Sequence, residues 1–171
     1  MAYVTPGTVA AGDVATAAAW NVLTNDVIAH QSIMSNVVEG TYSTAVTNST
    51  VTYATSNLAA TITPFSTASR IKVEYHVQGY KPSGVTATGM NLIVYVGASQ
   101  IVPSTRQQMG NVGASTNVVF TVDNAFIHSP ATTSATTYTL YFASTVAGQT
   151  VELHSYGVNS PGHIILTEIP A

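Results

Sequence analysis

The chain has 171 residues, enough to bury the core of one domain with a small appendage. Its net charge of −3 at pH 7 excludes the clustered basic surface that nucleic-acid binding requires. It has no cysteine, which excludes a disulfide framework, and no run of the ~20 apolar residues that cross a bilayer.

Only 6% of the residues are charged, against roughly 25% in an ordinary soluble domain. The surface of a domain with so few charged residues has little charge repulsion to keep the domain soluble and monomeric. We therefore expect much of it to be covered by copies of the chain or by a larger assembly. The alternative is a secreted adhesin-like domain with a neutral, hydroxyl-rich surface.

The first residues are rich in turn formers, and we expect residues 1–12 to be extended. They lack a basic region followed by an unbroken apolar run, so no signal peptide is predicted. We expect a protein that stays in a cytoplasm until it is assembled.

A helix is predicted from Asp13 or Thr16, either of which can cap its first turn, to about Ser35. Apolar residues recur in it at spacings of three, four and seven, with a histidine in the same seam: Trp20, Leu23, Val27, His30 and Met34. This stripe favours a short coiled coil, which needs partners because so short a helix is marginal alone. A helix packed on its own β domain is the alternative. We predict that residues 1–36 form an attachment arm and an oligomerising helix.

Residues 35–41 are predicted to be a connector ending at Gly40, and residues 41–171 the β domain. Segments rich in Val, Thr and Tyr between turn residues predict strands. They are residues 41–46, 50–54, 58–63, 70–79, 91–96, 100–102, 118–122, 138–142, 150–156 and 163–169. Residues 104–115 and 125–134 are predicted to be long loops. The pattern indicates a mainly β fold, an antiparallel jelly-roll-like β-sandwich, preceded by an extended arm and one N-terminal α-helix that forms a short coiled-coil stem.

The clearest strand is residues 70–79, where apolar and polar side chains alternate. Ile71, Val73, Tyr75 and Val77 share one face, which is predicted to be buried. Arg70, Lys72, Glu74 and His76 share the other, which meets water or a partner. With Lys81, Arg70 and Lys72 are interpreted either as an anionic-glycan or lipid patch or as gatekeepers and subunit contacts on an outward face.

Two parts of the chain resemble virion proteins of tailed phages. GDVATAAAWNVLTNDVIAH (residues 12–30) is similar to the opening of many short fibre and appendage proteins. TITPFSTASRIKVEYHVQGY (residues 61–80), YTLYFASTVAGQTVELHSY (residues 138–156) and the ending IILTEI (residues 164–169) resemble strands of phage fibre C-terminal domains. The resemblance implies a trimeric β-sandwich head on a short N-terminal stem. Because the chain has no shaft, a short spike, head fibre or capsid decoration protein fits its length better than a long tail fibre.

Motifs for catalysis are absent from the sequence: there is no metal-binding His-x-x-x-His helix, nucleophile elbow or phosphate-binding glycine loop. Glu74 and His76 share one strand face, and Glu152 and His154 are predicted to share another. If these strands were neighbours, the four groups could form a metal or acid–base site; the alternative is cross-strand polar pairing. No enzyme activity, metal or cofactor is predicted.

Three further features have alternative explanations. In a trimer, His30 would bring three imidazoles to the axis, where they could bind an ion or weaken assembly at acid pH, or it is a packed seam residue. The glycosylation sequon at Asn48 is treated as chance because no secretory signal precedes it. Loops on a rigid scaffold usually carry binding, which gives these candidate ligand or receptor contacts: Tyr80, Lys81, Arg106, Gln107, Gln108, Asn111 and Asn117.

The sequence thus predicts a non-enzymatic structural protein of the virion, assembled in the host cytoplasm. It would be a homotrimeric short fibre, spike or head-decoration protein that binds other virion proteins through residues 2–35. A host surface glycan is a candidate partner of the head, and no nucleic acid or membrane insertion is expected. The alternatives are a stand-alone glycan-binding or adhesin module and, with a metal or a carboxylate pair, a small hydrolase.

Overall fold

The computed structural model describes residues 21, 36–82, 88–101, 117–154 and 161–171. The chain divides into two compact units, Met1–Ser35 and Asn36–Ala171. In the first unit only Asn21 is described, and it is helical. The rest of the predicted helix, with the whole seam from Trp20 to Met34, lies outside the described residues, so the coiled-coil stem stays a prediction.

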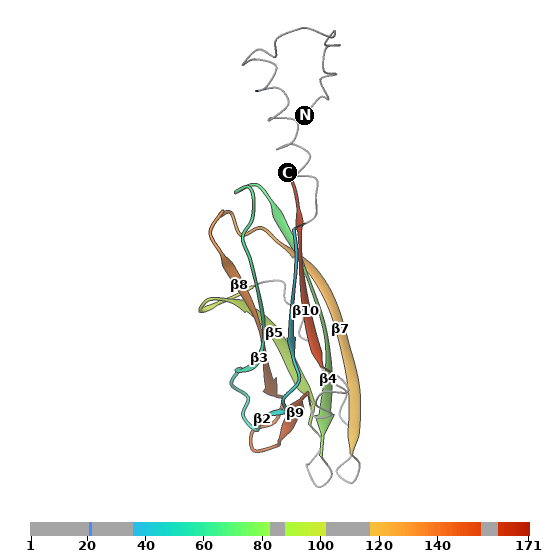
Figure 1. The fold of residues 1–171 in the computed structure, drawn as a ribbon. Coiled ribbons are helices and arrows are strands. Elements are labelled where there is room, and N and C mark those ends of the chain that lie inside the picture. The colour runs from blue at the N-terminus through green and yellow to red at the C-terminus, as the bar shows by residue number, and fades with distance from the viewer. Residues whose placement is uncertain (1–20, 22–35, 83–87, 102–116, 155–160) are drawn as a thin grey trace. The chain divides into compact units, whose positions relative to one another are not determined.

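The second unit is built from short antiparallel strands arranged in two layers (Figure 1). The described strands are β1 (Val37–Tyr42), β2 (Val46–Asn48), β3 (Ala54–Ile62), β4 (Arg70–Lys81), β5 (Met90–Val96), β6 (Ser99–Gln100), β7 (Val118–His128), β8 (Thr136–Ser144), β9 (Val151–Leu153) and β10 (Gly162–Ile169). The predicted antiparallel β-sandwich is therefore confirmed. The described residues contain no helix that is long and apolar enough to span a membrane.

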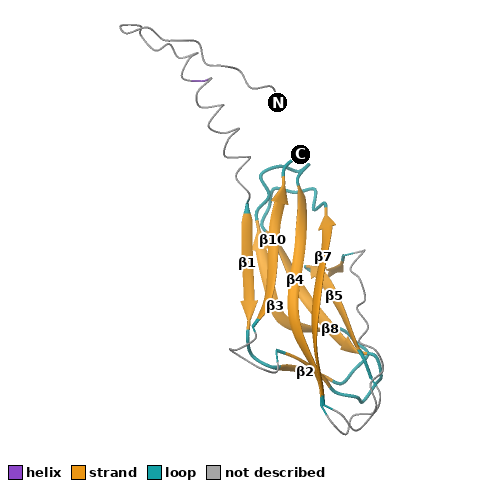
Figure 2. Cartoon of the chain, turned by 90° about the vertical axis from the view of Figure 1, so that its right-hand side faces the viewer, coloured by secondary structure: helices purple, strands orange, loops and turns teal. Residues whose placement is uncertain are grey.

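One sheet contains β1, β2, β4, β7, β9 and β10. β10 and β9 pair with successive parts of the same side of β4, and β1 and β2 continue along their far side. β7 occupies the opposite side of β4 over its full length. We call this the charged sheet, and Figure 2 shows β1, β10, β4 and β7 side by side in it.

The other sheet has the order β3-β8-β5-β6. We call it the uncharged sheet because none of its strand residues is Asp, Glu, Lys or Arg. The strand pairs of the two sheets are nested along the chain: β1 with β10, β3 with β8, β4 with β7 and β5 with β6. The domain is thus paired like one long hairpin that has been rolled over into two layers.

The core lies between the sheets, and β4 shows how the sequence specifies it. Ile71, Val73 and Val77 have no exposed surface and Tyr75 is 4% exposed, as the alternation predicts. From β8, Tyr138, Leu140 and Phe142 face the same core and are fully buried. The period-two pattern therefore correctly predicts the inward face of β4, and β8 alternates in the same way.

Residues 35–41 are not a connector, because β1 begins at Val37 and pairs with β10 from its first residue. Gly40, predicted to be a breaker, lies inside the strand. A Cβ atom there would lie 1.9 Å from the Ala59 carbonyl oxygen of β3. Glycine therefore allows β1 to approach the backbone of the uncharged sheet, and the β domain begins earlier than residue 41.

Two other predicted boundaries were wrong. Residues 50–53 connect β2 to β3 and are not a strand, because the buried Asn48 side chain accepts from Thr50 N–H and donates to the Thr52 and Phe142 carbonyls. The predicted loop from residue 125 begins only after His128, because β7 continues along β4 to its end. Asn48 is thus a structural residue, which agrees with treating its sequon as chance.

Candidate functional site

The outer face of the charged sheet carries one row of polar side chains across four strands. The antiparallel register places Thr41 of β1, His163 of β10, His76 of β4 and Asp123 of β7 opposite one another in turn. Glu39, two residues before Thr41 on β1, projects on the same face. These four strands are far apart in the sequence, and their pairing brings two histidines and two carboxylates together.

Each histidine in this row is bound to a carboxylate on the strand at its outer side. His163 Nδ1 lies 2.6 Å from Glu39 Oε1, and His76 Nδ1 is hydrogen-bonded to Asp123 Oδ1. Across the sheet the order is carboxylate, imidazole, imidazole, carboxylate. The side chains of both pairs are at least one-third exposed, and such exposed ion pairs contribute at most about 1 kcal/mol to stability. Their effect is to orient the rings.

The row borders an open hollow of about 430 Å³. Its lining residues are Glu74, Tyr75, His76, Asp123, Asn124, Ala125, His163 and Ile165. Glu74 is 2.8 Å from Lys72 Nζ, so one of its oxygens faces a cation on the same strand. The volume falls within the range of small-ligand sites, about 300–1,000 Å³, but the hollow is wide open to solvent.

The hydrogen bonds define the chemistry that the imidazoles can offer. An ionised carboxylate only accepts hydrogen bonds, so the Nδ1 atom that faces it carries the proton. In a neutral ring the Nε2 atom then has a free lone pair. His76 and His163 can therefore each accept a proton, a hydrogen bond or a metal ion at Nε2.

The predicted grouping of Glu74 and His76 with Glu152 and His154 does not form. Glu152 lies opposite Tyr80, towards the other end of β4 from Glu74. β9 ends at Leu153, and His154 has a positive φ of 60°, which turns its side chain away from the face that Glu152 occupies. The alternation in VELHSY therefore fails at the end of the strand.

His154 is instead a fully buried core residue. Its ring packs edge-on against Tyr42 at 5.5 Å and against Gly162, where a Cβ atom would lie 2.4 Å from the imidazole. Neither ring nitrogen has a hydrogen-bond partner among the described residues. Burial lowers the pKa of His154, and the nearby backbone of Ser56 opposes this shift. The residue is neutral at physiological pH.

The predicted ligand contacts fall into three groups. Tyr80 is half-buried on β4 and donates to the exposed Asn117, so these two are adjacent. Lys81 was wrongly placed on the outward face: β4 continues through it, and the alternation directs it inward with no exposed surface. Four other candidates lie outside the described residues: Arg106, Gln107, Gln108 and Asn111.

Sequence reasoning missed three members of the row, Glu39, Asp123 and His163. His76 was identified as outward-facing, but its partners are 47 and 87 residues further along the chain. Glu39 lay in the presumed connector. The only signal available was that each of the three is a polar residue in an alternating segment, which predicts its face but not its neighbours across the sheet.

Comparisons with known proteins complete the description. No model of a protein family matches the chain, and no curated protein matches it. Among solved structures, a chain from the "Structure of infectious bursal disease virus Gt strain" is similar, with a TM-score of 0.42 and 12% sequence identity. The similarity covers 81% of this chain and 38% of that chain, so this chain spans less than half of the protein it resembles.

Proposed function

We propose that this chain is a non-enzymatic structural protein of a virus particle. It would be a homotrimer whose residues 2–35 attach it to other virion proteins and whose sandwich forms the head of a short fibre, spike or decoration of a tailed phage. The phage-like segments in the sequence support this role. The nested strand pairing supports a jelly roll, in which antiparallel pairs are rolled into two sheets.

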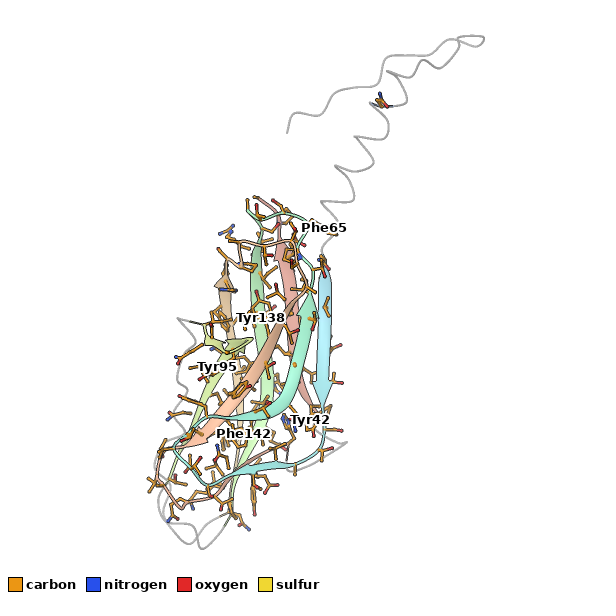
Figure 3. The ribbon with its side chains drawn as sticks, turned by 90° about the vertical axis from the view of Figure 1, so that its left-hand side faces the viewer. Tyr42, Phe65, Tyr95, Tyr138 and Phe142 are labelled. Carbon is orange, nitrogen blue, oxygen red and sulfur yellow. The ribbon has the colours of Figure 1, made fainter. Side chains whose placement is uncertain are left out.

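The observation that carries the proposal is the uncharged sheet. Its outward side presents Thr55 and Thr61 from β3, Thr137 and Thr139 from β8, and Asn91 and Tyr95 from β5. Figure 3 labels Tyr95 on this sheet. Every charged residue on a described strand belongs to the charged sheet. A surface without charge can be covered by another protein without the cost of removing ions from water.

Identical copies are the occupants that we propose for this surface. The low charged fraction of the whole chain favours self-association, and the predicted seam at residues 20–34 would bring copies of the chain together. In this arrangement the uncharged sheets face neighbouring copies, and the charged sheet with its histidine row faces outwards.

Lysine substitutions on the two sheets test the assignment. Thr61 and Thr137 are exposed cross-strand partners whose hydroxyls are 2.7 Å apart, so Thr61→Lys with Thr137→Lys puts two charges on the uncharged sheet. A control, Thr121→Lys, adds a charge at an exposed position of β7 on the charged sheet. The proposal predicts that the double variant weakens the trimer at least tenfold, or about 1.4 kcal/mol, because buried unpaired charges destabilise an interface. Sedimentation at several concentrations measures this, and equal affinity in the double variant and the control would contradict it.

Attachment through the N-terminal segment has its own test. Removing residues 1–35 cuts the chain at the boundary between its two compact units. We expect a soluble head that no longer joins particles during assembly. Incorporation of the shortened chain at the normal level would contradict the assigned role of the segment.

One observation favours a second candidate function, a stand-alone glycan-binding module. Tyr95 and Tyr141 lie on the uncharged sheet with ring centroids 4.5 Å apart, and half-buried rings beside threonines are a surface on which a neutral sugar can stack. This alternative predicts a monomer with affinity for neutral glycans that is lost in Tyr95→Ala. The mass of the purified chain distinguishes it from the trimer.

A further inference from the structure

The histidine row has the arrangement that proteins use to prepare an imidazole for a metal ion. A metal-binding histidine commonly donates its other ring N–H to a carboxylate, which fixes the tautomer and the ring and raises the basicity of the ligand nitrogen. His76 does this towards Asp123 and His163 towards Glu39. Nothing in ordinary cross-strand pairing requires both neighbours to be held in the same way.

We propose that the outer face of the charged sheet binds one divalent transition-metal ion between Nε2 of His76 and Nε2 of His163. Water completes the coordination. The described residues contain no group of three or more His, Cys, Asp or Glu arranged to hold a metal, and the proposed site uses two imidazoles as its protein ligands. Asp123 and Glu39 are positioning residues that act through the rings.

The strand register places the two histidines close enough to bind the same ion. His76 and His163 are direct partners in the β4–β10 ladder, where Cβ atoms of opposed residues are about 4.5–5.5 Å apart and project on the same face. A tetrahedral ion with bonds of about 2.0–2.1 Å holds two nitrogens roughly 3.3 Å apart, which two such side chains can span. Both residues also line the same open hollow, which gives an ion access from solvent.

The surrounding charges favour a cation. The carboxylates of Asp123, Glu39 and Glu74 lie around the two rings, and among the described residues a lysine, Lys72, is paired with Glu74. Imidazole nitrogens suit Zn²⁺, Ni²⁺ and Cu²⁺, whereas Mg²⁺ and Ca²⁺ prefer oxygen ligands. We therefore expect binding to follow the order Cu²⁺ above Ni²⁺ and Zn²⁺, with no binding of Mg²⁺ at this site.

The test uses the full chain, stripped of metal with a chelator and titrated calorimetrically with Zn²⁺, Ni²⁺, Cu²⁺ and Mg²⁺. One transition-metal ion should bind per chain. His76→Ala and His163→Ala should each weaken it at least tenfold, and the double variant should be little worse than either, because one imidazole alone does not hold the ion. A site in which both substitutions left the stoichiometry and affinity unchanged would overturn the proposal, as would the absence of binding at millimolar metal.

Two further variants separate positioning from structure. Asp123→Asn and Glu39→Gln should weaken metal binding about 10–100-fold, the usual effect of losing such a partner. Their thermal unfolding without metal should hardly change, because exposed ion pairs contribute at most about 1 kcal/mol. If the two variants lose as much free energy of unfolding without metal as they lose in metal binding, the ion pairs serve only to hold the strands together. His128→Ala is the matched control, since His128 is bonded to Tyr138 on the inner side of β7 and should leave binding unchanged.

The metal site lies within a single chain, so metal binding and trimer formation are measured separately. A negative result for the metal site can therefore be told from a negative result for the proposed virion role. Loss of metal binding in the histidine variants with an unchanged trimer mass would support both. An unchanged affinity with a trimer mass would remove only the metal site.

Discussion

Glu168 connects three segments of the sandwich, and its replacement by glutamine tests how much one buried carboxylate contributes. The side chain is 3% exposed. Its Oε2 accepts from Asn36 Nδ2 at 2.9 Å and its Oε1 from the backbone N–H of Phe65 at 2.8 Å. The carboxylate on β10 thus holds the residue before β1 and the loop after β3.

The magnitude follows from these bonds. A hydrogen bond to a charged group contributes about 1.5–3 kcal/mol, and an unpaired buried donor costs about 1–3 kcal/mol. Glutamine keeps one acceptor oxygen but turns an NH₂ group towards at least one of the donors around the carboxylate. We expect Glu168→Gln to lower the free energy of unfolding by about 2–4 kcal/mol at pH 7.

The effect has a predicted pH dependence. Burial alone would raise the pKa of Glu168, but the side chains of Ser69 and Asn36 and the backbone of Phe65 and Ser66 together outweigh it and lower the pKa below 4.5. A carboxyl group whose pKa falls on folding stabilises the folded state above its unfolded pKa, and this is lost as pH falls through the folded pKa. The difference between the wild type and Glu168→Gln should therefore narrow from pH 7 to pH 3.

Urea unfolding followed by circular dichroism at pH 7 and pH 3 measures the loss in free energy of unfolding and its dependence on pH. The control is Glu152→Gln, because Glu152 is a half-buried outward residue of β9 and should change stability by less than about 0.5 kcal/mol. The reasoning is refuted if Glu168→Gln is as harmless as the control at pH 7, or if the difference is the same at both pH values.

Two more substitutions test the packing. Gly40→Ala would push a Cβ atom to 1.9 Å from the Ala59 carbonyl oxygen, so we expect a loss of about 3 kcal/mol or more in urea unfolding. Gly97→Ala should cost only the roughly 1–2 kcal/mol of a left-handed residue, since no atom lies within 4 Å, and an equal loss in both would contradict the close packing of β1 on β3. Because burial lowers the pKa of His154, the unfolded chain takes up its proton first, and stability falls as pH drops below about 6.5. His154→Asn, which tolerates the positive φ, should reduce this loss in thermal unfolding between pH 7 and pH 5, and an unchanged loss would contradict it.

The fold could be predicted from the sequence where the alternation of apolar and polar residues within one strand shows which face is buried. β4 alternates so regularly that its buried face was correct residue by residue, and β3, β5, β8 and β10 were placed within a few residues. β1 was missed because Gly40 is a common breaker, and only the three-dimensional approach of Ala59 explains why a glycine is needed inside a strand.

The histidine row could not be predicted from the sequence. His76 was placed on the outward face, but its partners on β7 and β10 depend on which strands pair, and alternation does not contain that information. His154 was assigned to the wrong face because one left-handed residue ends the alternation. Lys81 was grouped with the outward Arg70 and Lys72, although the alternation of β4 extends through it, since a strand can continue to the residue before a proline.

The central claim is that identical copies cover the uncharged sheet. Sedimentation velocity of the full chain at micromolar concentration measures it most directly. If identical copies cover the sheet, the chain sediments as a species with three times the 17.8 kDa mass of one chain. A single stable species with the mass of one chain at the same concentration would contradict it.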